Sequence, residues 1–90
     1  MKRVHIIISG DVQGVGFRAW MRGQALKLGL TGWVKNRPDK TVEAVVEGSE
    51  EKLRELIKDC HHGPEVAWVT EVQITWGKHQ NEFMTFEVRF

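Results

Sequence analysis

The 90 residues, spanning 1–90, suffice for one small domain with a single hydrophobic core. Hydrophobic residues make up 41% of the chain and the formal net charge is +1, which argues against a disordered chain and gives no indication of a nucleic-acid or membrane partner. Because there is one cysteine, no signal peptide and no apolar run near the roughly 20 residues of a membrane span, we expect no internal disulfide and a cytoplasmic location.

The first predicted strand covers residues 3–9, where apolar and polar residues alternate. The segment Ser9–Arg18 follows and is rich in glycine. A glycine-rich bend before a helix can bring several backbone N–H groups to one point, which suits an anion and above all phosphate. Arg18 at the helix entrance would add a planar positive charge. The spacing fits neither a P-loop nor a dinucleotide fingerprint, and the loop alone supports anion binding and a plain tight turn equally.

The first helix is predicted to begin at Phe17 and to end before Gly29, which suits a left-handed C-cap. Its apolar residues recur at helical spacing: Phe17, Met21, Ala25 and Leu28. Gly23 inside this helix is unfavourable, and a close contact between helix and sheet would explain it. Strands are predicted over residues 30–36 and 41–47, and the short turn between them indicates an antiparallel hairpin.

A second helix is predicted from the N-cap Ser49 to the stop signal Gly63-Pro64. Its predicted buried stripe comprises Leu53, Leu56, Ile57 and Cys60. We interpret the thiol of Cys60 as inert. A fourth strand is predicted over residues 66–76, with these residues on one face: Trp68, Val72, Ile74 and Trp76. The last strand is predicted to alternate through Met84, Phe86, Val88 and Phe90.

The predicted element order is β-α-β-β-α-β with an additional C-terminal strand. Two helices with one apolar stripe each must bury both stripes on a sheet, which predicts an α+β fold of two layers with an antiparallel sheet. The same order also builds RNA-recognition modules, which stack bases on aromatic residues of the first and third strands. The corresponding outward positions here carry no aromatic residue: His5, Ile7, Glu43, Val45 and Glu47.

Three segments closely resemble the acylphosphatase family: Gly10–Arg18, Leu28–Asn36 and Val42–Ala44. The likeness extends over the whole chain in length, in element order and in the Gly63-Pro64 helix end. Members of that family are small ferredoxin-like enzymes that hydrolyse carboxyl-phosphate anhydrides. The resemblance therefore implies a ferredoxin-like sandwich and acylphosphatase activity. A domain that binds phosphate without turnover is the alternative, which the intact Arg18 and Asn36 disfavour.

The resemblance also implies roles for particular residues. Arg18 would bind the phosphoryl group together with loop N–H groups, and Asn36 would hold the attacking water. The implied N–H donors are Gln13, Gly14, Val15, Gly16 and Phe17. We further expect an acyl phosphate as substrate, phosphate or sulfate as competing anions, and a monomer. No metal, organic cofactor, nucleic acid or membrane is expected to take part.

Two positions depart from the family pattern. Lys40 stands where the family usually has glycine in the hairpin turn, which predicts a strained turn or another turn type. Asp11 places a negative charge beside an anion site, so we expect its side chain to point to solvent. Trp20, which lies off the apolar stripe of its helix, is a candidate for the edge of an acyl-group site.

Overall fold

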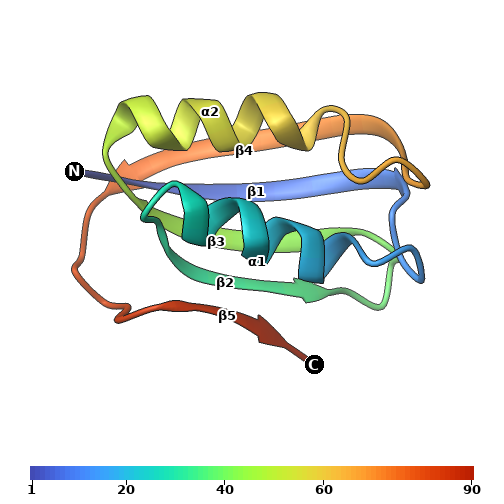
Figure 1. Ribbon diagram of the computed structural model, residues 1–90, viewed down its shortest axis with the longest axis horizontal. Coiled ribbons are helices and arrows are strands. Elements are labelled where there is room, and N and C mark those ends of the chain that lie inside the picture. Colours follow the sequence, from blue (N-terminus) through green and yellow to red (C-terminus); the bar gives the residue numbers. More distant parts are fainter.

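The computed structural model describes all 90 residues and has two layers, a sheet and a pair of helices that cover one of its faces (Figure 1). The elements in chain order are β1 (Lys2–Asp11), α1 (Phe17–Lys27), β2 (Thr31–Asn36), β3 (Val42–Gly48), α2 (Glu50–Cys60), β4 (Trp68–Lys78) and β5 (Phe86–Arg89). The predicted α+β sandwich is confirmed. Neither helix has the length and apolar character that crossing a membrane requires.

The strands lie side by side in the order β4-β1-β3-β2-β5. β1 pairs antiparallel with β3 and β4, and β2 pairs antiparallel with β3, which confirms the predicted hairpin. β5 pairs parallel with β2, so the sheet is mixed and the prediction of a wholly antiparallel sheet is wrong at this edge. The chain leaves β4 at one edge and crosses to the other edge, where it enters β5 from the end at which β2 also begins (Figure 1).

The core lies between the helices and the sheet and comprises 17 buried residues. The predicted stripe of α2 is buried throughout, whereas the stripe of α1 is buried except at Leu28, which is half-buried. Gly29 has a φ of 71° and Ser49 accepts a hydrogen bond from the N–H of Lys52, so both predicted caps are confirmed. Cys60 is fully buried, and this burial raises the pKa of its thiol to about 12.

A β-bulge changes the predicted face of β4. Ser9 of β1 opposes Glu71, but the next residue, Gly10, opposes Val69, so β4 has one extra residue at this point. The extra residue reverses the alternation, and Val69 packs against the core while Trp68 is 73% exposed. Trp68 therefore does not share the face of Val72 and Trp76, which pack against the core, and the prediction of one common face is wrong at Trp68. Ile74, on the edge strand, is 40% exposed.

The ends of the last predicted strand also differ from the structure. β5 covers only Phe86–Arg89, with Phe86 buried in the core. Met84 and Phe90 flank the strand and are exposed. The apolar alternation therefore continues beyond the residues that pair.

Glu47 of β3 holds the loop between β4 and β5. This side chain, predicted on the open outward face of the sheet, is only 1% exposed. Its carboxylate accepts hydrogen bonds from the N–H of Gln80 at 2.8 Å, the N–H of Glu82 at 3.2 Å and the guanidinium of Arg3 at 3.1 Å. Burial by itself would raise the pKa of Glu47, but the hydrogen bonds outweigh it and the pKa lies below its usual value. The loop therefore covers part of the outward face.

Candidate active site

The loop between β1 and α1 lies at the end of the sheet where β2 and β5 also end (Figure 1). Gly14 and Gly16 have φ values of 74° and 77°, a region that glycine enters without strain. Gly10, at the bulge, has a φ of 124°, and a Cβ atom there would collide with the carbonyl oxygen of Trp68. The path of this loop therefore depends on its glycines.

The backbone N–H groups of this loop have no acceptor within the protein. No N–H group of residues 13–19 donates to a backbone carbonyl, and the N-cap residue Gly16 has no side chain that could accept. These donors belong to the segment that leads into α1 and to the first turn of that helix, where the helix dipole is positive. Such an arrangement favours an anion. We name residues 13–19 the amide loop.

A cavity of about 190 Å³ opens beside the amide loop. It is lined by Val12, Gly14, Gly16, Phe17, Arg18, Ala19, Asn36, Val88 and Phe90. Arg18 of α1 and Asn36 of β2, which the sequence analysis assigned to one site, thus line the same cavity. Arg18 is the one charged side chain in this lining, so the charge of the cavity wall is positive.

β5 fixes the position of Arg18. The Nη1 atom of Arg18 donates to the carbonyl oxygen of Arg89 at 3.1 Å, and its guanidinium carbon lies 4.6 Å from the centre of the Phe90 ring. Both contacts arise because β5 runs parallel to β2 and brings its last residues to this end of the sheet. The sequence analysis missed these partners, since nothing in the local pattern indicates the direction of β5.

The predicted phosphate-binding residues fall into two groups. Gly14, Gly16 and Phe17 line the cavity. Val15 packs against the core. The side chain of Gln13 turns to the β2–β3 hairpin, where its Nε2 atom donates to two carbonyl oxygens. Gln13 and Val15 therefore form a second part of the loop, whose side chains contact the rest of the protein rather than the cavity.

Comparison with known proteins identifies the family. The acylphosphatase family matches residues 4–88. The chain belongs to the acylphosphatase family. It is 48% identical over 88 residues to an acylphosphatase of Pelotomaculum thermopropionicum, which covers 98% of this chain and 96% of that protein. It is 55% identical over 78 residues to an acylphosphatase of Thermococcus kodakarensis, which covers 84% of this chain and 86% of that protein.

The fold agrees with the sequence relationship. The crystal structure of an acylphosphatase from Bacillus subtilis superimposes with a TM-score of 0.96 at 36% identity, over 100% of both chains. The fold is therefore the ferredoxin-like sandwich of acylphosphatases. Membership of this family supports hydrolysis of acyl phosphates as the activity of the chain.

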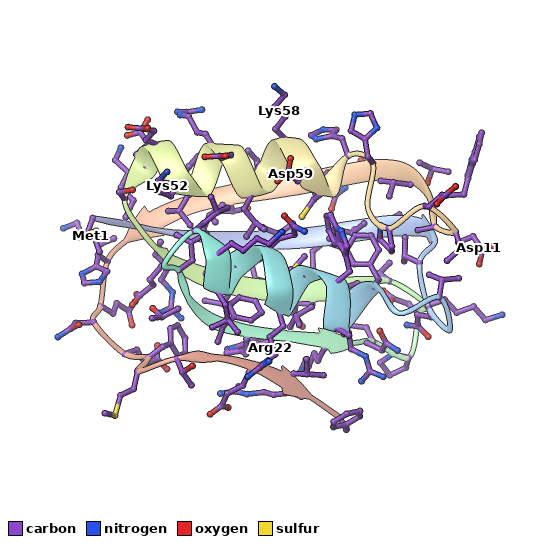
Figure 2. The ribbon with its side chains drawn as sticks, in the orientation of Figure 1. Met1, Asp11, Arg22, Lys52, Lys58 and Asp59 are labelled. Carbon is purple, nitrogen blue, oxygen red and sulfur yellow. The ribbon has the colours of Figure 1, made fainter.

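The two departures from the acylphosphatase pattern have separate explanations. Lys40 has a φ of 73°, a left-handed conformation that glycine adopts more easily, so the turn is strained at this residue. Asp39 offsets this strain by accepting from the hydroxyl of Thr41 at 2.6 Å and from its N–H at 3.1 Å, which lowers the pKa of Asp39. Asp11 is exposed at the end of β1, as expected (Figure 2).

Trp20 lies outside the cavity lining. Its ring packs edge-on against Phe17, with the ring centres 5.2 Å apart and the planes at 65°. Phe17 in turn lines the cavity. Trp20 therefore contacts a residue of the cavity wall rather than the cavity itself.

Proposed function

We propose that the amide loop and Arg18 bind the phosphoryl group of an acyl phosphate, and that Asn36 orients the water that attacks phosphorus. The observation that supports this most is that α1, the loop before it and β2 contribute to one cavity. Backbone N–H groups and a guanidinium are the donors that phosphoryl oxygens accept best. Inorganic phosphate and sulfate would compete for the same donors.

The chemistry of the substrate matches this simple set of groups. An acyl phosphate releases a carboxylate, whose conjugate acid has a pKa of about 4. Such a group leaves without being protonated, so no general acid is required. The transition state of phosphoryl transfer is loose and requires mainly positioning and stabilisation of charge. The amide loop and Arg18 would provide both.

The role of Asn36 follows from the chemistry of its side chain. A carboxamide cannot take up a proton at neutral pH, but its oxygen can accept from water and its NH₂ can donate to a phosphoryl oxygen. The water oxygen forms a bond to phosphorus while the bond to the acyl oxygen breaks, and the water proton passes to a phosphoryl oxygen of the substrate. The products are a carboxylate and inorganic phosphate. No step of this scheme uses a metal or an organic cofactor.

The remaining wall of the cavity would face the acyl group. Three of its residues are apolar: Val12, Val88 and Phe90. Acidic side chains are absent from the lining. An acyl group that is small and apolar or aromatic, such as benzoyl, would therefore fit better than a cationic one.

The test is hydrolysis of benzoyl phosphate by the wild type and by Arg18→Gln. We expect a fall of about 1,000-fold in kcat/KM and weaker inhibition by inorganic phosphate, because the guanidinium is the main charged donor. Arg22→Gln is the matched control. Arg22 lies one turn further along α1 (Figure 2) and also donates to a β5 carbonyl, that of Phe86 at 3.2 Å, but it is not part of the cavity lining.

The control variant should keep wild-type turnover. Equal losses in Arg18→Gln and Arg22→Gln would show that contact with β5, and not contact with substrate, matters. Wild-type turnover by Arg18→Gln would contradict the proposed function directly.

A further inference from the structure

The side chain of Gln13 connects two parts of the site. Its Nε2 atom donates to the carbonyl oxygen of Arg37 at 2.8 Å and to that of Thr41 at 2.9 Å. Arg37 directly follows Asn36, and Thr41 directly precedes β3. One carboxamide therefore ties the amide loop to the turn that begins at Asn36.

Both acceptors also take part in the hydrogen bonds of the turn itself. The carbonyl of Thr41 accepts from the N–H of Arg37 at 2.9 Å, and the carbonyl of Arg37 accepts from the N–H of Lys40 at 3.1 Å. A carbonyl oxygen has two lone pairs, so the bridge from Gln13 uses the second acceptor position at each. Among uncharged side chains, only Asn and Gln carry two N–H donors on one nitrogen. The bridge therefore fixes the loop to the turn at two points.

We propose that Gln13 is a positioning residue, whose carboxamide sets the spacing between the phosphoryl-binding donors and the side chain of Asn36. This inference rests on the function proposed above. Attack in line with the leaving group requires the water and the phosphorus to be held in a set relation, and a displacement of about 1 Å can cost on the order of 100-fold in rate. The backbone N–H of Gln13 stays in the loop whatever the side chain.

The first test is Gln13→Met, which keeps the length of the side chain and removes both donors. We expect kcat for benzoyl phosphate to fall at least about tenfold, with changes under about threefold in KM and in the inhibition constant of inorganic phosphate, because the binding donors remain. Gln73→Met is the matched control: this exposed amide of β4 donates to Glu71 at 3.0 Å and is not in the cavity lining. Its kcat should equal that of the wild type.

A double-mutant cycle with Asn36→Ala separates positioning from other roles. If Gln13 acts through Asn36, then Gln13→Met should slow the Asn36→Ala enzyme by less than about twofold. An equal slowing in both backgrounds would show that the bridge does not act through Asn36, and the inference would be wrong while the proposed function stands. Wild-type turnover by Asn36→Ala would overturn the proposed role of Asn36 and the inference with it.

Gln13→Glu provides an independent measurement. At neutral pH the introduced carboxylate has no donor and faces two carbonyl oxygens, but protonation gives it one O–H donor. We expect its kcat relative to Gln13→Met to rise as the pH falls from about 7 to about 5. Asp39 in the same turn is present in both variants, so its titration cancels in the ratio. A constant ratio, or a loss of the folded state in both variants by circular dichroism, would overturn the inference.

Discussion

The β4–β5 loop and the amide loop lie at opposite ends of the sheet (Figure 1) and use their backbone N–H groups in opposite ways. At one end, the β4–β5 loop donates the N–H groups of Gln80 and Glu82 to the carboxylate of Glu47. At the other end, the N–H groups of the amide loop have no acceptor in the protein. Donors that the chain satisfies internally hold a loop in place, whereas donors at a cavity wall are available to an anion. The comparison distinguishes a structural loop from a candidate binding loop.

The arginines at the two ends differ in the same way. Arg3 contacts two carboxylates, those of Glu47 at 3.1 Å and Glu82 at 2.7 Å, and the hydrogen bond to Glu82 contributes most to raising its pKa. Arg18 contacts a carbonyl oxygen and an aromatic ring, and no carboxylate. The charge of Arg3 is therefore neutralised within the protein, whereas that of Arg18 can act on a ligand.

Replacing Asn36 tests the end that we assign to catalysis, and its effect should exceed those of the substitutions at Glu47 and Gly23 that follow. We expect Asn36→Ala to lower kcat for benzoyl phosphate by about 100-fold, because an unoriented water attacks less often. The inhibition constant of inorganic phosphate should change less than about twofold, since the amide loop and Arg18 are untouched. Steady-state kinetics with phosphate as inhibitor measure both. A large loss of phosphate affinity would show that Asn36 binds the anion instead.

Replacing Glu47 tests the opposite end. We expect Glu47→Gln to lower the free energy of unfolding by about 2 kcal/mol, because the loop donors and Arg3 lose a charged acceptor. Turnover per folded molecule should stay at the wild-type level, since Glu47 is remote from the cavity lining. Urea denaturation and kinetics at a temperature where both proteins are folded give the two values. A loss of turnover without a loss of stability would contradict the comparison.

The pH dependence of stability sharpens this prediction. The pKa of Glu47 is lower in the folded protein than in the unfolded chain, so ionised Glu47 stabilises the fold fully above the unfolded value of about 4.3. That contribution is lost as the pH falls through the folded pKa. The difference in unfolding free energy between the wild type and Glu47→Gln should therefore shrink as the pH falls from about 5 towards about 3. A difference in unfolding free energy that grows in acid would contradict a pKa of Glu47 that is lower in the folded protein.

The smallest effect is expected at Gly23, which belongs to neither end. A Cβ atom at this position of α1 would meet no other atom within 4 Å, so the close contact with the sheet suggested by the sequence is absent. Gly23→Ala should raise the free energy of unfolding by about 1 kcal/mol through helix propensity and leave kcat unchanged. Thermal unfolding together with the hydrolysis assay checks this. A fall in stability would show that the helix needs glycine for another reason.

What could be predicted from the sequence was mainly local. The helix caps, the apolar stripes and the β2–β3 hairpin follow from neighbouring residues, and so does the loop that carries Gly14 and Gly16. The pairing of β5, the bulge opposite Gly10 and the burial of Glu47 depend on segments far apart in the chain. Periodicity carries no information on these pairings. The catalytic roles of Arg18 and Asn36 stay predictions, although the structure places both at one cavity.

The burial of Cys60 has a practical consequence. Thiol reagents attack the thiolate, and a fully buried thiol with a pKa raised to about 12 offers almost none in the folded protein. Alkylation must therefore wait until the end of α2 separates from the core. Since the chain has a single cysteine, the rate at which Cys60 is alkylated under native conditions reports how often the end of α2 opens. Each stability variant described above can thus be ranked by mass spectrometry without denaturant.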